Sequence, residues 1–140
     1  MDARVEKLFE GYGKAFTALE MRRVAGLYAE NFVAAGPKGV ISQDRETFLA
    51  NADKAAEFYR SVGQKSAKIK KATETWFSDK YVMVTIHWAV TFESLTEPAE
   101  FDVSYLVQLT DDTPRIILFI SHEDEQETMQ KLGLLKSQPG

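Results

Sequence analysis

The chain has 140 residues and a formal net charge of −4, from 17 Lys and Arg against 21 Asp and Glu, which disfavours a nucleic-acid partner. The sequence contains no cysteine, so disulfides, thiolate zinc sites and thiol nucleophiles are excluded. This length fits a single domain over residues 1–140.

The first stretch of the chain shows helical periodicity. Apolar residues spaced by threes and fours predict an amphipathic helix there: Val5, Leu8, Phe9, Tyr12, Phe16 and Leu19. Gly11 and Gly13 each weaken this helix by roughly 1 kcal/mol relative to alanine, so a reason such as close packing is expected for them. The charges of this stretch do not suit a signal peptide, and no apolar run approaches the ~20 residues of a membrane span. We therefore expect a cytoplasmic protein without a membrane partner.

Two further helices are expected before residue 63. Val24, Leu27 and Tyr28 predict a short helix that ends near Glu30, followed by a strand at 31–35 and a turn at 36–39. Ser42 is the expected N-cap of a longer helix that runs to about residue 61 and ends before Gly63. The expected apolar stripe of that helix is Phe48, Leu49, Ala52, Ala55, Ala56, Tyr59 and Val62.

From residue 66 onward the pattern is that of strands. Alternating apolar residues predict strands at 67–77, 80–93, 100–110 and 115–121, joined by turns and a loop. A short helix at 124–132 follows, and Gly133 terminates it. Helices followed by a long antiparallel meander define an α+β fold in one domain.

The strand at 80–93, KYVMVTIHWAVTFE, has two different faces. One face is uniformly apolar and predicts a core: Val82, Val84, Ile86, Trp88, Val90 and Phe92. The opposite face is mixed, yet it carries no formal charge apart from what His87 holds. A solvated face normally carries Lys or Glu, so we expect a second copy of the chain to cover this one. The expected interface of this homodimer is formed by Tyr81, Met83, Thr85 and His87.

Three local motifs accompany this order of elements. They are LYAENF at 27–32, PKG at 37–39, and ISHED at 120–124 after the meander. Together they resemble the nuclear transport factor 2-like superfamily, which includes polyketide cyclase-like (SnoaL-like) and ketosteroid isomerase-like proteins. The resemblance implies a cone-shaped, strongly curved antiparallel sheet capped by N-terminal helices. This fold hosts isomerases, dehydratases, cyclases and non-catalytic binding modules, so it does not define an activity.

The isomerase branch of the superfamily has its general-base aspartate directly before the proline of the strand-end turn. Here Gly36 stands before Pro37, and Ala35 precedes it. Neither residue can abstract a proton, so the mechanism of that branch does not transfer.

Few residues suit acid/base or metal chemistry. The chain has only His87 and His122 as histidines, and with no cysteine we expect neither a metal site nor a cofactor. A structural or interface role is favoured for His87, and a capping or loop role for His122. The alternative is an acid/base pair of His122 and Asp102 at a pocket, because Asp102 interrupts an otherwise apolar strand and family dehydratases use His and Asp.

Aromatic residues are the candidates for ligand contact, because the wide end of this cone is often not filled. The resemblance and the strand pattern favour Tyr28, Phe32, Trp88 and Tyr105 as ligand-binding residues. The expected function is therefore binding of a small apolar molecule. Two alternatives remain: a lyase or isomerase that acts on a small apolar or polyketide-like substrate, and a non-catalytic protein-interaction module.

Overall fold

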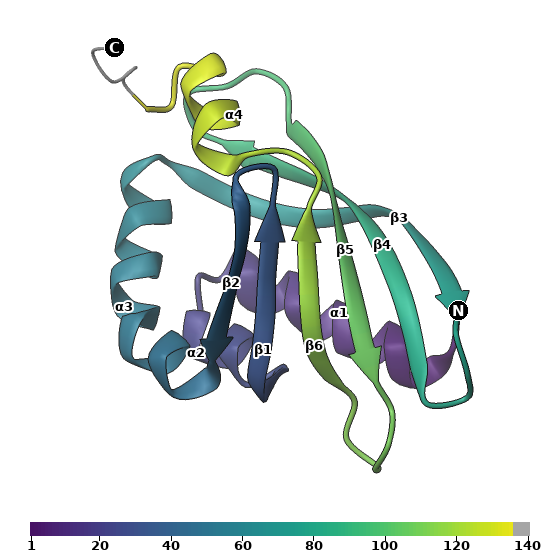
Figure 1. Cartoon of the computed structure of the whole chain (residues 1–140). Coiled ribbons are helices and arrows are strands. Elements are labelled where there is room, and N and C mark those ends of the chain that lie inside the picture. Colours follow the sequence, from purple (N-terminus) through teal and green to yellow (C-terminus); the bar gives the residue numbers. More distant parts are fainter. Residues whose placement is uncertain (136–140) are drawn as a thin grey trace.

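The computed structural model describes residues 1–135, which form four helices and one six-stranded sheet. The helices are α1 (Ala3–Thr17), α2 (Met21–Ala25), α3 (Arg45–Ser61) and α4 (Glu125–Lys131). The strands are β1 (Tyr28–Gly36), β2 (Gly39–Asp44), β3 (Gln64–Trp76), β4 (Tyr81–Phe92), β5 (Ala99–Gln108) and β6 (Arg115–Ser121). Figure 1 shows a curved sheet with α1 behind it, α3 along one side and α4 at one end.

The strand order across the sheet is β2-β1-β6-β5-β4-β3. The pairings are antiparallel except for β1 with β6, which is parallel. The predicted α+β fold with a curved sheet and N-terminal helices is confirmed. The parallel pair is a departure from the expected all-antiparallel sheet. It is formed by the last strand, β6, and the first, β1, which are separated in the sequence by the whole of the intervening chain.

The inner face of β4 forms the centre of the core, as its alternation predicts. Val82, Val84 and Ile86 have no exposed surface, and Trp88 is also buried. The apolar face of α1 packs against this side of the sheet through Val5 and Phe9. Burial of such side chains is the main favourable contribution to folding.

The predicted second helix is wrong in its extent. It ends at Ala25, with Gly26 as its C-cap, and Tyr28 already belongs to β1. The cause is tertiary: the N–H of Ile116 donates to the carbonyl of Leu27 at 3.0 Å, and Tyr28 is aligned with Ile116 in the parallel pair. Pairing with a strand nearly ninety residues later overrides a helical pattern that local spacing favours.

The predicted N-cap of the third helix is also wrong. Ser42 lies within β2, a strand that the sequence did not indicate because its residues are mostly exposed and lack alternation. Asp44 is the N-cap, and its side chain accepts a hydrogen bond from the N–H of Thr47 at 2.7 Å. This hydrogen bond holds the pKa of Asp44 below its usual value. Leu49, placed on the apolar stripe, is exposed.

Two glycine predictions have mixed outcomes. Gly63 follows α3 with a φ of +79°, the left-handed conformation expected of a helix terminator. Close packing does not require a glycine at Gly13, where an added Cβ would lie at an ordinary contact distance of 3.7 Å from the carbonyl oxygen of Ala67 on β3. It does not explain Gly11, where an added Cβ would meet nothing within 4 Å.

Among residues 1–135, no helix combines the length and the apolar character needed to cross a membrane.

Candidate functional site

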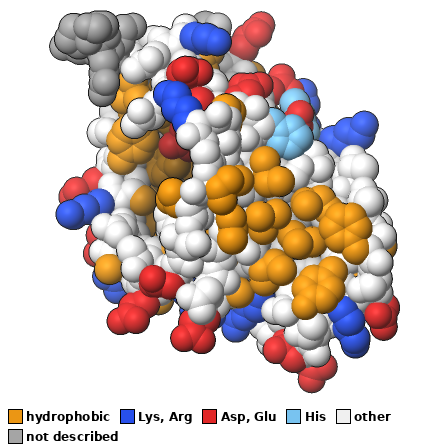
Figure 2. Space-filling view, viewed as in Figure 1, with side chains coloured by type: hydrophobic (Ala, Val, Ile, Leu, Met, Phe, Trp, Pro, Cys, Tyr) orange, Lys and Arg blue, Asp and Glu red, His pale blue; other side chains and the backbone are white. Residues whose placement is uncertain are grey.

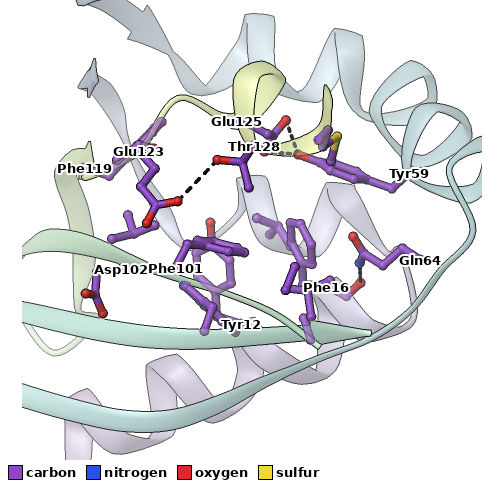
Figure 3. A pocket seen from close by; sticks show the side chains of 18 of the residues that line it. Tyr12, Phe16, Tyr59, Gln64, Phe101, Asp102, Phe119, Glu123, Glu125 and Thr128 are labelled. Carbon is purple, nitrogen blue, oxygen red and sulfur yellow. Dashed lines mark hydrogen bonds between the residues drawn. The ribbon is translucent and has the colours of Figure 1, made fainter. Parts of the chain in front are cut away.

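A cavity of about 220 Å³ lies between the inner face of the sheet, α1, α3 and α4. Figure 3 shows the side chains that surround it. Its walls are largely aromatic because the inner faces of four strands and the apolar faces of two helices converge there. The aromatic lining residues are Tyr12, Phe16, Tyr28, Phe48, Tyr59, Trp88, Phe92, Phe101, Tyr105 and Phe119.

Neutral polar groups lie among these rings. The hydroxyls of Tyr12 and Tyr28 are 2.8 Å apart, and the indole N–H of Trp88 donates to the hydroxyl of Tyr105 at 2.9 Å. Burial raises the pKa of Tyr12, Tyr28 and Tyr105 well above the ordinary tyrosine value. These hydroxyls therefore remain protonated at physiological pH and can serve as hydrogen-bond donors or acceptors toward a ligand.

The opposite side of the cavity is closed by the β6–α4 connection and α4. Asp124 caps α4 by accepting from the N–H of Glu127 at 2.9 Å, and the buried Met129 anchors the helix on the cavity. Glu125 belongs to the exposed first turn, but its carboxylate faces inward and accepts a hydrogen bond from the hydroxyl of Tyr59 at 3.1 Å. Partial desolvation of this carboxylate at the cavity raises the pKa of Glu125.

The structure places three of the four predicted ligand-binding residues in the cavity wall: Tyr28, Trp88 and Tyr105. Phe32 is not in the wall. It packs behind it, with its ring centroid 4.6 Å from that of Tyr28. Their role in ligand binding stays a prediction.

Sequence reasoning missed the acidic side of the cavity. Glu125 falls within the helix expected at 124–132 without a role of its own, and Tyr59 is expected only on an apolar stripe. Glu123 follows His122 in the ISHED motif, but nothing in the motif indicates that its side chain lines a cavity. The sequence did contain one signal for this acidic side, namely the three consecutive acids at 123–125 directly after the last strand.

The suggested pair of His122 and Asp102 is not formed between their side chains. The carboxylate of Asp102 lies 2.8 Å from Nδ1 of His87, and Nε2 of His122 lies 2.8 Å from the hydroxyl of Ser104. The two residues are joined only through the backbone, where the N–H of His122 donates to the carbonyl of Asp102. The reason is register: Asp102 is aligned with His87 across β4 and β5, so the nearest imidazole to its carboxylate is that of His87.

His87 lies in a charged network on the outer face of the sheet. Its Nε2 lies 2.8 Å from Oε1 of Glu100, which also accepts from Nζ of Lys70 at 3.1 Å. Hydrogen bonds to Glu100 and then to Asp102 raise the pKa of His87. Within residues 1–135, no group of three or more His, Asp or Glu side chains is arranged to hold a metal ion.

We predict that replacing Glu100 by glutamine lowers the pKa of the His87 imidazole. The native pKa is raised, so the pairing stabilises the fold fully below the unfolded value of about 6.5 and is lost as pH rises through the folded value. An NMR titration of the His87 ring protons measures the shift. Glu97→Gln, an exposed change in the loop before β5, is the control. An unchanged His87 titration in Glu100→Gln would contradict the network.

The outer face of the sheet carries an apolar row that crosses four strands. Cross-strand alignment places Met83 beside Leu106, Leu106 beside Leu118, and Leu118 beside Val33. Each of these side chains is half-buried, as are Tyr81, Thr85 and His87. Figure 2 shows hydrophobic side chains gathered over this face, with the histidines at its upper edge. No element of the described chain covers it.

A helix-capped, curved and unclosed sheet around an aromatic cavity defines a protein of the nuclear transport factor 2-like class, abbreviated NTF2-like. Residues 2–124 match the family model described as NTF2-like protein (DUF6841), and the chain belongs to this family. The resemblance inferred from the sequence motifs is thereby confirmed. No curated protein matches the chain.

Solved structures share the fold at low sequence identity. An NTF2-like protein of unknown function from Shewanella oneidensis is 18% identical over 86% of this chain and 97% of its own, with a TM-score of 0.69. A variant of Rv3472 from Mycobacterium tuberculosis, also of unknown function, is 15% identical over 86% of this chain and 70% of its own, with a TM-score of 0.68.

A third structure is described as the beta subunit of a proposed aromatic-ring-hydroxylating dioxygenase from Novosphingobium aromaticivorans. It is 12% identical over 87% of this chain and 88% of its own, with a TM-score of 0.65. At these identities the likeness concerns the fold.

Proposed function

We propose that this protein binds a small, largely apolar molecule in the aromatic cavity. The observation that carries the proposal is the cavity itself, about 220 Å³ in volume and walled by rings from four strands and two helices. An engineered apolar cavity of about 150 Å³ holds benzene, so this one is large enough for a single ring with a short substituent. The hydroxyls of Tyr12, Tyr28 and Tyr105 supply the few polar groups that orient a ligand in such sites.

Trp88 provides the test, because its indole lines the cavity and is nearly fully buried, whereas Trp76 is 41% exposed. In a Trp76→Phe variant the tryptophan emission reports on Trp88 alone. Titration with the neutral one-ring probe 2-phenylethanol is expected to change this emission in a saturable way and to raise the melting temperature. Absence of both responses at millimolar probe would refute the proposal.

The proposed assembly is a homodimer through the outer face of the sheet. What supports it is the apolar row Met83, Leu106, Leu118 and Val33, since a contiguous exposed patch on a sheet usually marks an interface. The interface would include the sequence-predicted residues Tyr81, Thr85 and His87. Their charged neighbours Glu100 and Lys70 would form its rim.

The dimer is tested by sedimentation equilibrium at micromolar concentration. We expect a dimeric mass for the native protein and a monomeric mass for Leu106→Glu, because a carboxylate in the middle of the row would be buried without a partner. Ile41→Glu is the matched control. Ile41 is exposed, but its register partner Ala34 alternates with the row, so the glutamate should leave the dimer intact. A monomeric native protein would refute the assembly.

The second candidate is acid/base catalysis on a small apolar or polyketide-like substrate. The observation that favours it is the carboxylate of Glu125, which lies at the cavity, has a raised pKa and accepts from Tyr59. Such a group has the properties of a general base. A Glu125→Gln variant that loses turnover but keeps binding of 2-phenylethanol would support this candidate.

A non-catalytic interaction module is the third candidate. It is supported by the outer apolar face and by the fold shared with a dioxygenase beta subunit, which is one component of a larger enzyme. If Leu106→Glu abolished capture of a different protein while the native chain stayed monomeric, this candidate would replace the homodimer. The cytoplasmic location stays a prediction from the sequence.

A further inference from the structure

The charged residues of the cavity lining all have the same sign. Three charged side chains line it, Asp102, Glu123 and Glu125, and all are acidic. Within the described residues no Lys, Arg or His contributes to the lining. A ligand that enters this cavity therefore meets carboxylates at one end and aromatic rings elsewhere.

Only two of these carboxylates are available to a ligand. Asp102 is paired with His87 on the outer face, and Figure 3 shows its carboxylate turned away from the cavity centre. Glu123 and Glu125 accept hydrogen bonds from neutral hydroxyls instead. Their donors are Thr128 Oγ1 at 3.3 Å and Tyr59 Oη at 3.1 Å.

The lysine that contacts this part of the chain is paired with other carboxylates. Nζ of Lys38 lies 3.6 Å from Asp124 and 3.7 Å from Glu127. No ion pair within residues 1–135 involves Glu123 or Glu125. A carboxylate has about four acceptor sites, and each of these two uses a small part of them. Both residues are exposed at this end of the cavity, and the negative charge that they bring to the lining favours a positively charged group by direct attraction.

Aromatic rings stand opposite the carboxylates. In Figure 3, Tyr12, Phe16 and Phe101 lie across the cavity from Glu123, Glu125 and α4. Ring faces attract cations and also pack well against another ring. The cavity thus combines walls that suit one aromatic ring with an acidic end, in a volume of about 220 Å³.

We propose that the cavity selects a small aromatic amine in its ammonium form, with the ring among the aromatic walls and the ammonium donating to Glu123 and Glu125. This ligand class rests on the proposed binding function, which it makes more specific. An anionic ligand of the same size would be repelled by both carboxylates. A neutral one would gain ring packing and hydrogen bonds but no charge attraction.

Three matched probes test the proposal by isothermal titration calorimetry at pH 7: 2-phenylethylamine as the cation, 2-phenylethanol as the neutral analogue and phenylacetate as the anion. We expect the amine to bind at least tenfold more tightly than the alcohol, and phenylacetate to bind most weakly. The double variant Glu123→Gln/Glu125→Gln should lose about tenfold in affinity for the amine and keep its affinity for the alcohol. Glu127→Gln, on α4 but outside the cavity lining and paired with Lys38, should change neither affinity.

The outcomes separate the two proposals. If the alcohol and the amine bind equally, or if the double variant retains full affinity for the amine, the charge selectivity is refuted and the binding function stands. If none of the three probes binds the native protein, the binding function is refuted, and the ligand class with it. The alcohol also shows whether the double variant keeps an intact cavity, since a neutral hydroxyl can hydrogen-bond to glutamine as it does to glutamate.

Discussion

Replacing Ile86 by alanine is expected to lower the free energy of unfolding by about 2–5 kcal/mol, the usual range for truncation of a fully buried isoleucine. Ile86 has no exposed surface and lies in the middle of β4, aligned with Ala72 on one side and Val103 on the other. The truncation removes apolar contacts and leaves a cavity that the two neighbouring strands cannot close without losing their register. Urea denaturation followed by circular dichroism measures the change.

Ile41→Ala provides the control for the same chemical change. Ile41 is 57% exposed on β2, at the edge of the sheet, so its truncation should cost less than about 1 kcal/mol. The two isoleucine variants thus distinguish burial from residue type. Similar losses in both would contradict the assignment of the inner face of β4 as the centre of the core.

The second large effect is expected at the paired hydroxyls of Tyr12 and Tyr28. Tyr12→Phe should lower stability by about 1–3 kcal/mol, because it leaves the buried hydroxyl of Tyr28 without the partner now at 2.8 Å. Tyr28→Phe should act in the same way from the other side. The double variant should cost clearly less than the sum of the two, since removing both hydroxyls leaves no polar group unsatisfied.

Tyr81→Phe controls for the loss of a tyrosine hydroxyl. Tyr81 is half-buried on the outer face, where its hydroxyl accepts a hydrogen bond from the side-chain amide of Gln108 at 3.0 Å. Water can replace this bond, so the change should lie within about 1 kcal/mol. All four variants are compared by chemical denaturation. Strict additivity of Tyr12→Phe and Tyr28→Phe would show that the two hydroxyls do not interact.

The sequence was sufficient for the class of fold because its strongest patterns are local. The alternation of β4 and the helical spacing of α1 up to Phe16 each depend on neighbouring residues, and both match the structure. Leu19, expected on the same helix, lies beyond its end at Thr17. Local patterns gave the wrong element where pairing with a distant or exposed strand determines the backbone conformation. Tyr28 fits a helical pattern but belongs to β1, and Ser42 fits an N-cap but pairs within β2.

The candidate site was only half predictable. Aromatic residues on an apolar strand face indicate an interior, so Trp88 and Tyr105 could be placed toward the cavity. The volume left unfilled depends on how helices and sheet pack, which no local pattern contains. The side chains of His122 and Asp102 are not paired for a similar reason, because strand register places Asp102 opposite His87.

The parallel pairing of β1 with β6 has a consequence for how the chain acquires its structure. Tyr28 and Ile116 become neighbours only after almost the whole chain is available, whereas β3, β4, β5 and β6 follow one another as adjacent hairpins. Contacts between distant residues carry the larger loop-closure entropy and slow folding. We therefore expect the meander to assemble first, and the N-terminal third to dock onto its free edge late in the process, completing the cavity as the final event.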